Sequence, residues 1–167
     1  MRDKLTRSDI KKMEEEIEYR KLTLRKELLE HVKETRAHGD LSENFEYHAA
    51  KREKNKNESR IRYLERMIKT AEVISDTSGE GEAGINDLIT VYFEEDEMEE
   101  QYKIVTTVRS NSLENLISLE SPLGKALLGH KVSDRVMVKV NDSVSYPVQI
   151  RRIEKNDDDE DDKIRSY

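Results

Sequence analysis

Two carboxylates, Asp40 and Glu43, stand three residues apart directly after Gly39. Acids at the start of a helix can cap it, because they satisfy its free amide groups and its dipole. A carboxylate pair on an exposed turn can also bind a cation, and magnesium is usually held by one or two protein carboxylates, with other ligands from substrate and water. Ser42 is an alternative cap that would leave Asp40 free to point outward. The spacing alone leaves both interpretations open.

Long helices on both sides would place these acids at the tip of a hairpin. From Ser8 to about Ala37, apolar residues recur at spacings of three, four and seven, with an interruption at Lys21. They are Ile10, Met13, Ile17, Leu24, Leu28 and Val32. Ser8 and Asp9 give an N-cap signal, and Gly39 gives a stop signal. A second helix is predicted from residues 40–42 to about Ile74, with an apolar face made of Phe45, Ala49, Ile61, Leu64, Ile68 and Ala71.

Two striped helices joined by a short turn must bury their stripes against each other, so residues 1–74 are predicted to form an antiparallel coiled-coil hairpin. Each arm of about 30 residues would be on the order of 45 Å long. We expect the best packing at the base of the hairpin. The second helix turns polar between Lys51 and Arg60, so charge pairs should support the thinner packing toward the tip.

The second half of the chain has a different pattern. Residues 75–84 have the composition of a flexible linker. Short β-prone runs follow at Leu88 to Phe93, Tyr102 to Val108, Leu116 to Leu119, Val136 to Val140 and Val144 to Arg151. A short helix is predicted after Ser121 as cap, with Pro122 in its first position and Gly129 after its end. Residues 85–155 therefore form a small α+β domain, and the acidic tail of residues 156–167 is predicted to be disordered.

Composition limits the possible functions. Charged residues make up 40% of the 167 and hydrophobic residues 34%, so a single large core is not expected. Without cysteine there is no disulfide or thiolate zinc site. Residues 1–76 carry 19 Lys/Arg against 17 Asp/Glu, whereas residues 77–167 carry 11 against 20. This acidity argues against nonspecific binding to duplex DNA. No apolar run approaches the roughly 18 residues of a membrane span, and we expect a cytoplasmic protein.

Two separated motifs carry a resemblance to a known family. The run from Gly39 to Lys51, with the long helix before it, closely resembles the bacterial transcript cleavage factors of the GreA/GreB family, and within it the GreA type. The stretch from Asn115 to Gly129 is similar to that family's C-terminal FKBP-like domain. The resemblance covers roughly residues 5–155. It implies an α+β protein in which a coiled-coil hairpin is followed by an FKBP-like domain.

The resemblance implies a factor that binds RNA polymerase and stimulates the polymerase's own cleavage of backtracked RNA, without being an enzyme alone. The C-terminal domain would dock on the rim of the secondary channel, through Ser121, Pro122, Leu123, Gly124, Leu128 and Gly129. The hairpin would enter the channel and bring Asp40 and Glu43 to the polymerase active site. There they would help to hold the second Mg²⁺ and orient the attacking water, whereas the isolated protein would carry no cofactor.

Further residues near the tip would contact polymerase or RNA. Candidate tip contacts are Leu41, Ser42, Asn44 and Phe45. Ser42 could instead cap the helix, and Leu41 and Phe45 could instead close the hairpin. Phe45 departs from the family pattern, in which alanine is common at this position. Arg36, Lys51, Arg52, Lys54 and Lys56 are either a solvated helix face or a basic patch that meets the 3' end of the nascent RNA. The partners are therefore RNA polymerase and nascent RNA, with no membrane, and the protein is expected to be a monomer.

Other functions compete with this one. An inhibitory paralogue would enter the same channel without promoting cleavage; Asp40 and Glu43 argue against it, whereas Phe45 and the acidic tail keep it open. A peptidyl-prolyl isomerase would need an aromatic-lined pocket, for which residues 84–155 offer only Tyr92, Phe93, Tyr102 and Tyr146. A coiled-coil adaptor would explain the hairpin but not the tip motif.

Overall fold

The computed structural model describes residues 2–39 and 43–166, and the chain divides into two compact units. The hairpin unit contains residues 9–71 together with Arg2 and Asp3. The sheet unit contains residues 4–8 and 72–166. The predicted tip residues Asp40, Leu41 and Ser42 lie outside the described residues.

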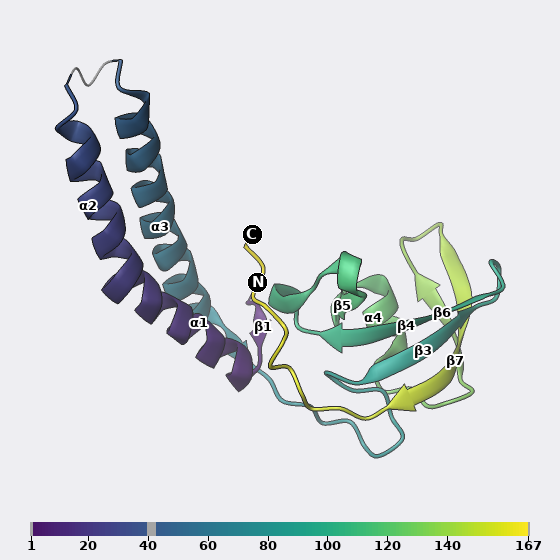
Figure 1. Ribbon diagram of the computed structural model, residues 1–167. Helices are drawn as coiled ribbons and strands as arrows, with labels where there is room; N and C mark the ends of the chain where they lie inside the picture. Colours follow the sequence, from purple (N-terminus) through teal and green to yellow (C-terminus); the bar gives the residue numbers. More distant parts are fainter. Residues whose placement is uncertain (1, 40–42, 167) are drawn as a thin grey trace. The chain divides into compact units, whose positions relative to one another are not determined.

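The hairpin unit has the predicted helical arms (Figure 1). The first arm comprises α1 (Arg7–Tyr19), a π-helical turn η1 (Arg20–Leu24) and α2 (Arg25–Arg36), and α3 (Phe45–Thr70) is the second. The N-cap predicted at Ser8 and Asp9 is wrong, because α1 already begins at Arg7. Gly39, with φ of +118°, confirms the predicted stop, since glycine adopts this conformation without steric cost.

Apolar packing between the arms is deepest at the base, as predicted. The buried apolar side chains of the unit are Met13, Tyr47, Ala50, Ile61, Leu64 and Met67. The prediction that Phe45 and Ala49 join the seam is wrong: Phe45 is 84% exposed and Ala49 is also exposed. Toward the tip, the side of α3 that faces the first arm continues from Ile61 through Asn57 and Lys54 to Ala50 and Tyr47, at helical spacings of three and four. Because Asn57 and Lys54 are polar, the sequence shows no apolar stripe there.

A polar layer of Glu16, Arg20, Asn57 and Arg60 joins the arms at mid-height. Glu16 Oε2 accepts from Arg20 Nε and from Arg60 Nε, each at 2.8 Å. Nearby, Arg25 makes two hydrogen bonds to the carboxylate of Glu58, at 2.8 and 3.0 Å. Charge pairs therefore support the hairpin where its apolar packing thins.

The polar layer predicts a pH dependence. Burial alone would raise the pKa of Glu16, but hydrogen bonds from Arg60 and Arg20 outweigh it and lower that pKa below its ordinary 4.5. A carboxyl whose pKa is lowered by folding stabilises the fold above its unfolded pKa, and this stabilisation is lost as pH falls through the folded value. Glu16→Gln should therefore lower the free energy of unfolding at pH 7, and the deficit should shrink at about pH 3. Urea unfolding followed by circular dichroism measures this, and a deficit independent of pH would contradict the assignment.

The sheet unit is built on five strands in the order β5-β4-β3-β7-β6. They are β3 (Leu88–Phe93), β4 (Met98–Val105), β5 (Leu116–Ser118), β6 (Arg135–Lys139) and β7 (Ser145–Glu154). Neighbouring strands are antiparallel except β4 and β5. Buried Ile89, Val91, Val148 and Ile150 form the centre of its core, against which Leu127 of the helix α4 (Pro122–Leu127) packs. Together with the hairpin, this confirms the predicted α+β class.

Shorter elements complete the sheet unit. The strands β1 (Lys4–Leu5) and β2 (Glu72–Val73) pair in parallel, and short 3₁₀ turns form at η2 (Thr107–Arg109) and η3 (Ser112–Glu114). Because β2 uses residues 72 and 73, α3 ends at Thr70 instead of the predicted Ile74. Residues 75–84, predicted as a linker, belong to the sheet unit, where Ala83 is fully buried and donates its amide to His130 O.

The prediction of disorder in the acidic tail is wrong for residues 156–166. Asp162 is 8% exposed, and its Oδ2 accepts from Lys103 Nζ at 2.8 Å and from Arg109 Nη1 at 2.9 Å. Arg165 donates its backbone amide to Val108 O at 2.8 Å. Specific ion pairs and backbone bonds thus hold the tail on the sheet unit, although most of its other acids stay exposed.

Candidate functional site

Asn44 closes the tip of the hairpin. Its Oδ1 accepts from the backbone amide of Tyr47 at 3.0 Å, which caps α3, and its Nδ2 donates to Thr35 O at 2.6 Å, in the last turn of α2. The predicted helix start at residues 40–42, with Asp40 or Ser42 as the cap, is therefore wrong. Asn44, predicted as a contact to polymerase, has an internal role. An asparagine at this position caps as well as an aspartate.

Glu43 takes no part in capping α3, because Asn44 is the N-cap. It lies before the cap, in a turn, and is exposed. Phe45, the first residue of α3, is also exposed, so it does not close the hairpin. The carboxylate of Glu43 is thus available at the tip, whereas the positions of Asp40, Leu41 and Ser42 stay predictions.

Part of the predicted basic patch lies around the side chain of Tyr47. The Arg36 guanidinium lies 5.7 Å from the centre of its ring, and Nη2 donates to the Tyr47 hydroxyl at 3.4 Å. That hydrogen bond and the charges of Lys51 and Lys54 lower the pKa of Tyr47. Three of the five predicted basic residues, Arg36, Lys51 and Lys54, therefore lie close enough to Tyr47 to act on its hydroxyl.

The other two basic residues are arranged differently. Arg52 and Lys56 are exposed, and Lys56 Nζ lies 3.9 Å from Glu53 Oε1 on the same helix. Tyr47 itself is buried at the tip end of α3. The contact between Tyr47 and Arg36 was not predicted, because these residues lie on different arms and meet only when the arms pair.

The predicted docking residues divide into internal and exposed groups. Ser121 caps α4 by accepting from Gly124 N at 3.1 Å. A Cβ at Gly124 would lie 2.0 Å from Ser118 O, so only glycine fits. Pro122, Leu128 and Gly129 are exposed, and Leu123 is half-buried against the core. Ser121 and Gly124 thus shape the turn, whereas docking through the exposed members stays a prediction.

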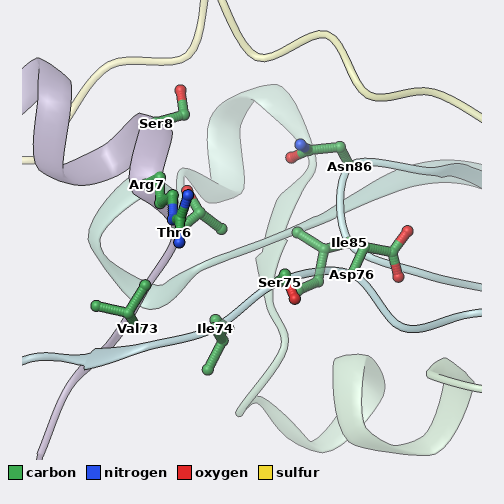
Figure 2. A pocket seen from close by; sticks show the side chains of 9 residues that line it. All are labelled: Thr6, Arg7, Ser8, Val73, Ile74, Ser75, Asp76, Ile85 and Asn86. Atoms are coloured by element: carbon green, nitrogen blue, oxygen red, sulfur yellow. The ribbon is translucent and has the colours of Figure 1, made fainter.

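The described residues of the sheet unit line hollows, and three of these differ in the predicted site residues that they contain. Leu128 and Gly129 line one of about 350 Å³ together with Ile74, Ile85 and Leu119. Ser121 lines a second of about 640 Å³. The third, of about 550 Å³, contains none of the predicted site residues, and Figure 2 shows its lining by residues 6–8, 73–76, Ile85 and Asn86.

None of these three hollows has an aromatic lining. Instead, the ring of Phe93 packs on those of Tyr102 and Tyr146, at 6.1 and 6.2 Å between centres, against the core. Burial and a hydrogen bond to Glu100 raise the pKa of Tyr102. These three rings thus pack together against the core of the sheet unit and line none of the three hollows described above.

Comparison with known proteins identifies the family. The model described as "Transcription elongation factor, N-terminal" matches residues 4–73, and that described as "Transcription elongation factor, GreA/GreB, C-term" matches residues 78–155. The chain belongs to the GreA/GreB family. It is thus a transcription elongation factor, and the resemblance noted in the sequence is confirmed.

Relatives of the GreA type match most of the chain. The transcription elongation factor GreA of Thermoanaerobacter pseudethanolicus is 46% identical over 137 residues, which cover 81% of this chain and 87% of the relative. GreA of Bacillus subtilis is 41% identical over 81% of this chain and 86% of its own. Among solved structures, GreA factor homolog 1 (Gfh1) of Thermus thermophilus is 25% identical, with a TM-score of 0.42, covering 93% of this chain and 100% of that one. Within residues 2–39 and 43–166, no helix is long and apolar enough to cross a membrane.

Proposed function

We propose that this GreA-family factor binds RNA polymerase and stimulates the polymerase's own endonucleolytic cleavage of backtracked RNA 3' ends. The hairpin enters the secondary channel, and the exposed part of the docking residues, Pro122, Leu128 and Gly129, contacts the channel rim. The factor acts as a monomer and completes the catalytic site of its partner. The observation that supports this most directly is that Asn44 caps α3, which leaves Glu43 exposed before the helix.

The chemistry of the tip suits a shared magnesium ion. Carboxylate oxygens are the ligands that Mg²⁺ prefers, and Mg²⁺ commonly keeps only one or two of them from protein. When bound, a second magnesium ion stabilises charge on the oxygens of the phosphate under attack. Glu43 and Asp40 would hold it from the side of the factor and orient the attacking water, while the polymerase aspartates hold the first ion.

A stalled, backtracked elongation complex with RNA labelled at its 5' end tests the function. Adding the factor should shorten the RNA and release a 3' fragment within minutes, and magnesium chelation should stop the reaction. Slower RNA synthesis without shortening would instead identify an inhibitory paralogue, as the exposed Phe45 at the tip permits.

The basic residues give a separate prediction. If Lys51, Arg52, Lys54 and Lys56 guide the extruded RNA, changing all four to Gln should slow cleavage more for long backtracked segments than for short ones. The loss should shrink at high salt, which already screens phosphate attraction. Cleavage rates measured on RNAs backtracked by different lengths provide the test.

The matched control replaces basic residues on the same helix nearer its base, Arg62, Arg66 and Lys69, by Gln. This variant loses similar charge but should cleave all substrates at the parent rate. If the two variants cleave every substrate at the same rate, the basic residues near the tip are only a solvated helix face. Exposed ion pairs on such a face contribute only about 0 to 1 kcal/mol to stability.

A further inference from the structure

The π-helical turn η1 and the buried Asn57 form a joint between the arms. Within η1, the amide of Arg25 donates to Arg20 O, five residues back. Asn57 Nδ2 donates to the same carbonyl oxygen at 3.2 Å. A carbonyl oxygen has two lone pairs and can accept both bonds. Asn57 thus contacts the carbonyl group around which the turn is widened.

The side chain of Arg20 completes a reciprocal pair. Arg20 Nη1 donates to Asn57 Oδ1 at 2.9 Å, and Arg20 Nε donates to Glu16, which also accepts from Arg60 of α3. Asn57 is 2% exposed, so its amide lies inside the hairpin. Leaving a buried amide without its partners costs about 1 to 3 kcal/mol, so this pairing disfavours any shift of one arm along the other.

The geometry of the first arm depends on this turn. A π-helical turn holds one residue more than an α-helical turn. If η1 became α-helical, the residues after it would be displaced by about one helical residue, which is about 1.5 Å along the axis and 100° around it. The following helix α2 ends at Arg36, close to the tip. The position of Glu43 therefore depends on whether η1 keeps its π-helical form.

We propose that Asn57 is a positioning residue that locks η1 in its π-helical form and fixes the register of the two arms. In this way it sets the height and rotation at which the tip acids are presented. Apolar layers such as Met13 and Leu64 have no directional bonds, whereas a single buried asparagine in a coiled-coil seam can specify register. The catalytic consequence rests on the proposed function, but the register lock can be measured without it.

Distances between spin labels test the lock in the full-length protein. The chain has no cysteine, so labels can be attached to cysteines introduced at the exposed positions Lys33 of α2 and Glu53 of α3. Asn57→Leu removes both hydrogen bonds to Arg20. We expect its distance distribution to broaden or shift, and its melting temperature to stay level or rise, because an apolar side chain in a seam often stabilises it. The control Asn55→Leu, on the exposed surface of α3, should keep the parent distribution.

Cleavage assays then connect register to function. Asn57→Leu should stimulate cleavage at least tenfold less than the parent while its affinity for polymerase changes less than twofold, and Asn55→Leu should match the parent. An unchanged distance distribution in Asn57→Leu would overturn the proposal, as would a changed distribution with full cleavage. If the parent protein stimulates no cleavage, the proposed function fails, and the distances alone decide whether Asn57 locks the register.

Asn57→Asp covers the case in which the leucine variant does not fold. Aspartate keeps the size and the acceptor for Arg20 but has no N–H for the Arg20 carbonyl. A shifted label distance in this variant supports the lock at η1. The parent distance would show that the donated bond to the turn is dispensable and would refute the proposal.

Discussion

Changing Asp40 to Asn or Glu43 to Gln is expected to lower stimulated RNA cleavage by about two orders of magnitude. This is the size of effect seen when one preorganised electrostatic contact to a transition state is removed. Both substitutions preserve the shape of the side chain, and Asn44 continues to cap α3, so the fold of the hairpin should not change. Cleavage rates in backtracked complexes, measured together with the affinity for polymerase, separate catalysis from docking.

Glu46→Gln is the matched control for this prediction. Glu46 is an exposed carboxylate in the first turn of α3, three residues beyond Glu43. Its variant should cleave at the parent rate. If all three variants cleave normally, the tip acids have no catalytic role; if all three lose affinity for polymerase together, the acids act in docking.

Asp162→Asn is expected to destabilise the sheet unit by about 3 kcal/mol, within the range for breaking a buried ion pair. The substitution removes the negative charge that lies between Lys103 and Arg109, whose side chains are 11% and 0% exposed. Both cations would then lose the carboxylate that they share, and the amide of asparagine carries no charge to replace it. Urea unfolding of the full chain, followed by circular dichroism of the sheet transition, measures the loss.

The neighbouring acid provides a sensitive comparison. Asp161 is exposed, so Asp161→Asn should change stability by no more than about 0.5 kcal/mol. The two variants have the same change in charge and composition one residue apart. If both substitutions change the free energy of unfolding by the same small amount, the tail is not bound to the sheet unit in solution.

Periodicity and local capping rules predicted much of the fold. The strand Leu88–Phe93 has its predicted ends, and the helix after Ser121 has its predicted cap. Both depend on interactions within a few residues. The seam near the tip was predicted wrongly because apolar character was counted, whereas the buried side of α3 continues through Asn57 to Tyr47. Lys21, which interrupts the apolar stripe, lies within η1, but the spacing of the stripe on either side of it stays that of an ordinary α-helix, so the π-helical turn was not predicted.

Interactions between distant residues account for the remaining differences. Asp40, Ser42 and Asn44 are all of residue types that cap helices, so the sequence alone did not fix where the second helix begins. Asn44 is the cap of α3, and it also bonds to Thr35 of the other arm. The acidic tail has the composition of a disordered segment, but Asp162 pairs with residues 53 and 59 positions earlier in the chain. No local pattern identifies which acid finds such partners. The site residues were predicted from the family resemblance, because the spacing of Asp40 and Glu43 alone fits a helix cap equally well.

The short parallel strands β1 and β2 join the two ends of the hairpin segment within the sheet unit. Lys4 pairs with Glu72 and Leu5 with Val73, and Ile74 donates its amide to Leu5 O at 2.9 Å. The residues on either side of the hairpin segment 9–71 therefore both belong to the sheet unit. A hairpin of different length or tip chemistry could be transplanted between Ser8 and Glu72 without cutting the core of the sheet unit. The same closure requires that lengthening one arm be matched in the other, so changes in reach must come as paired insertions.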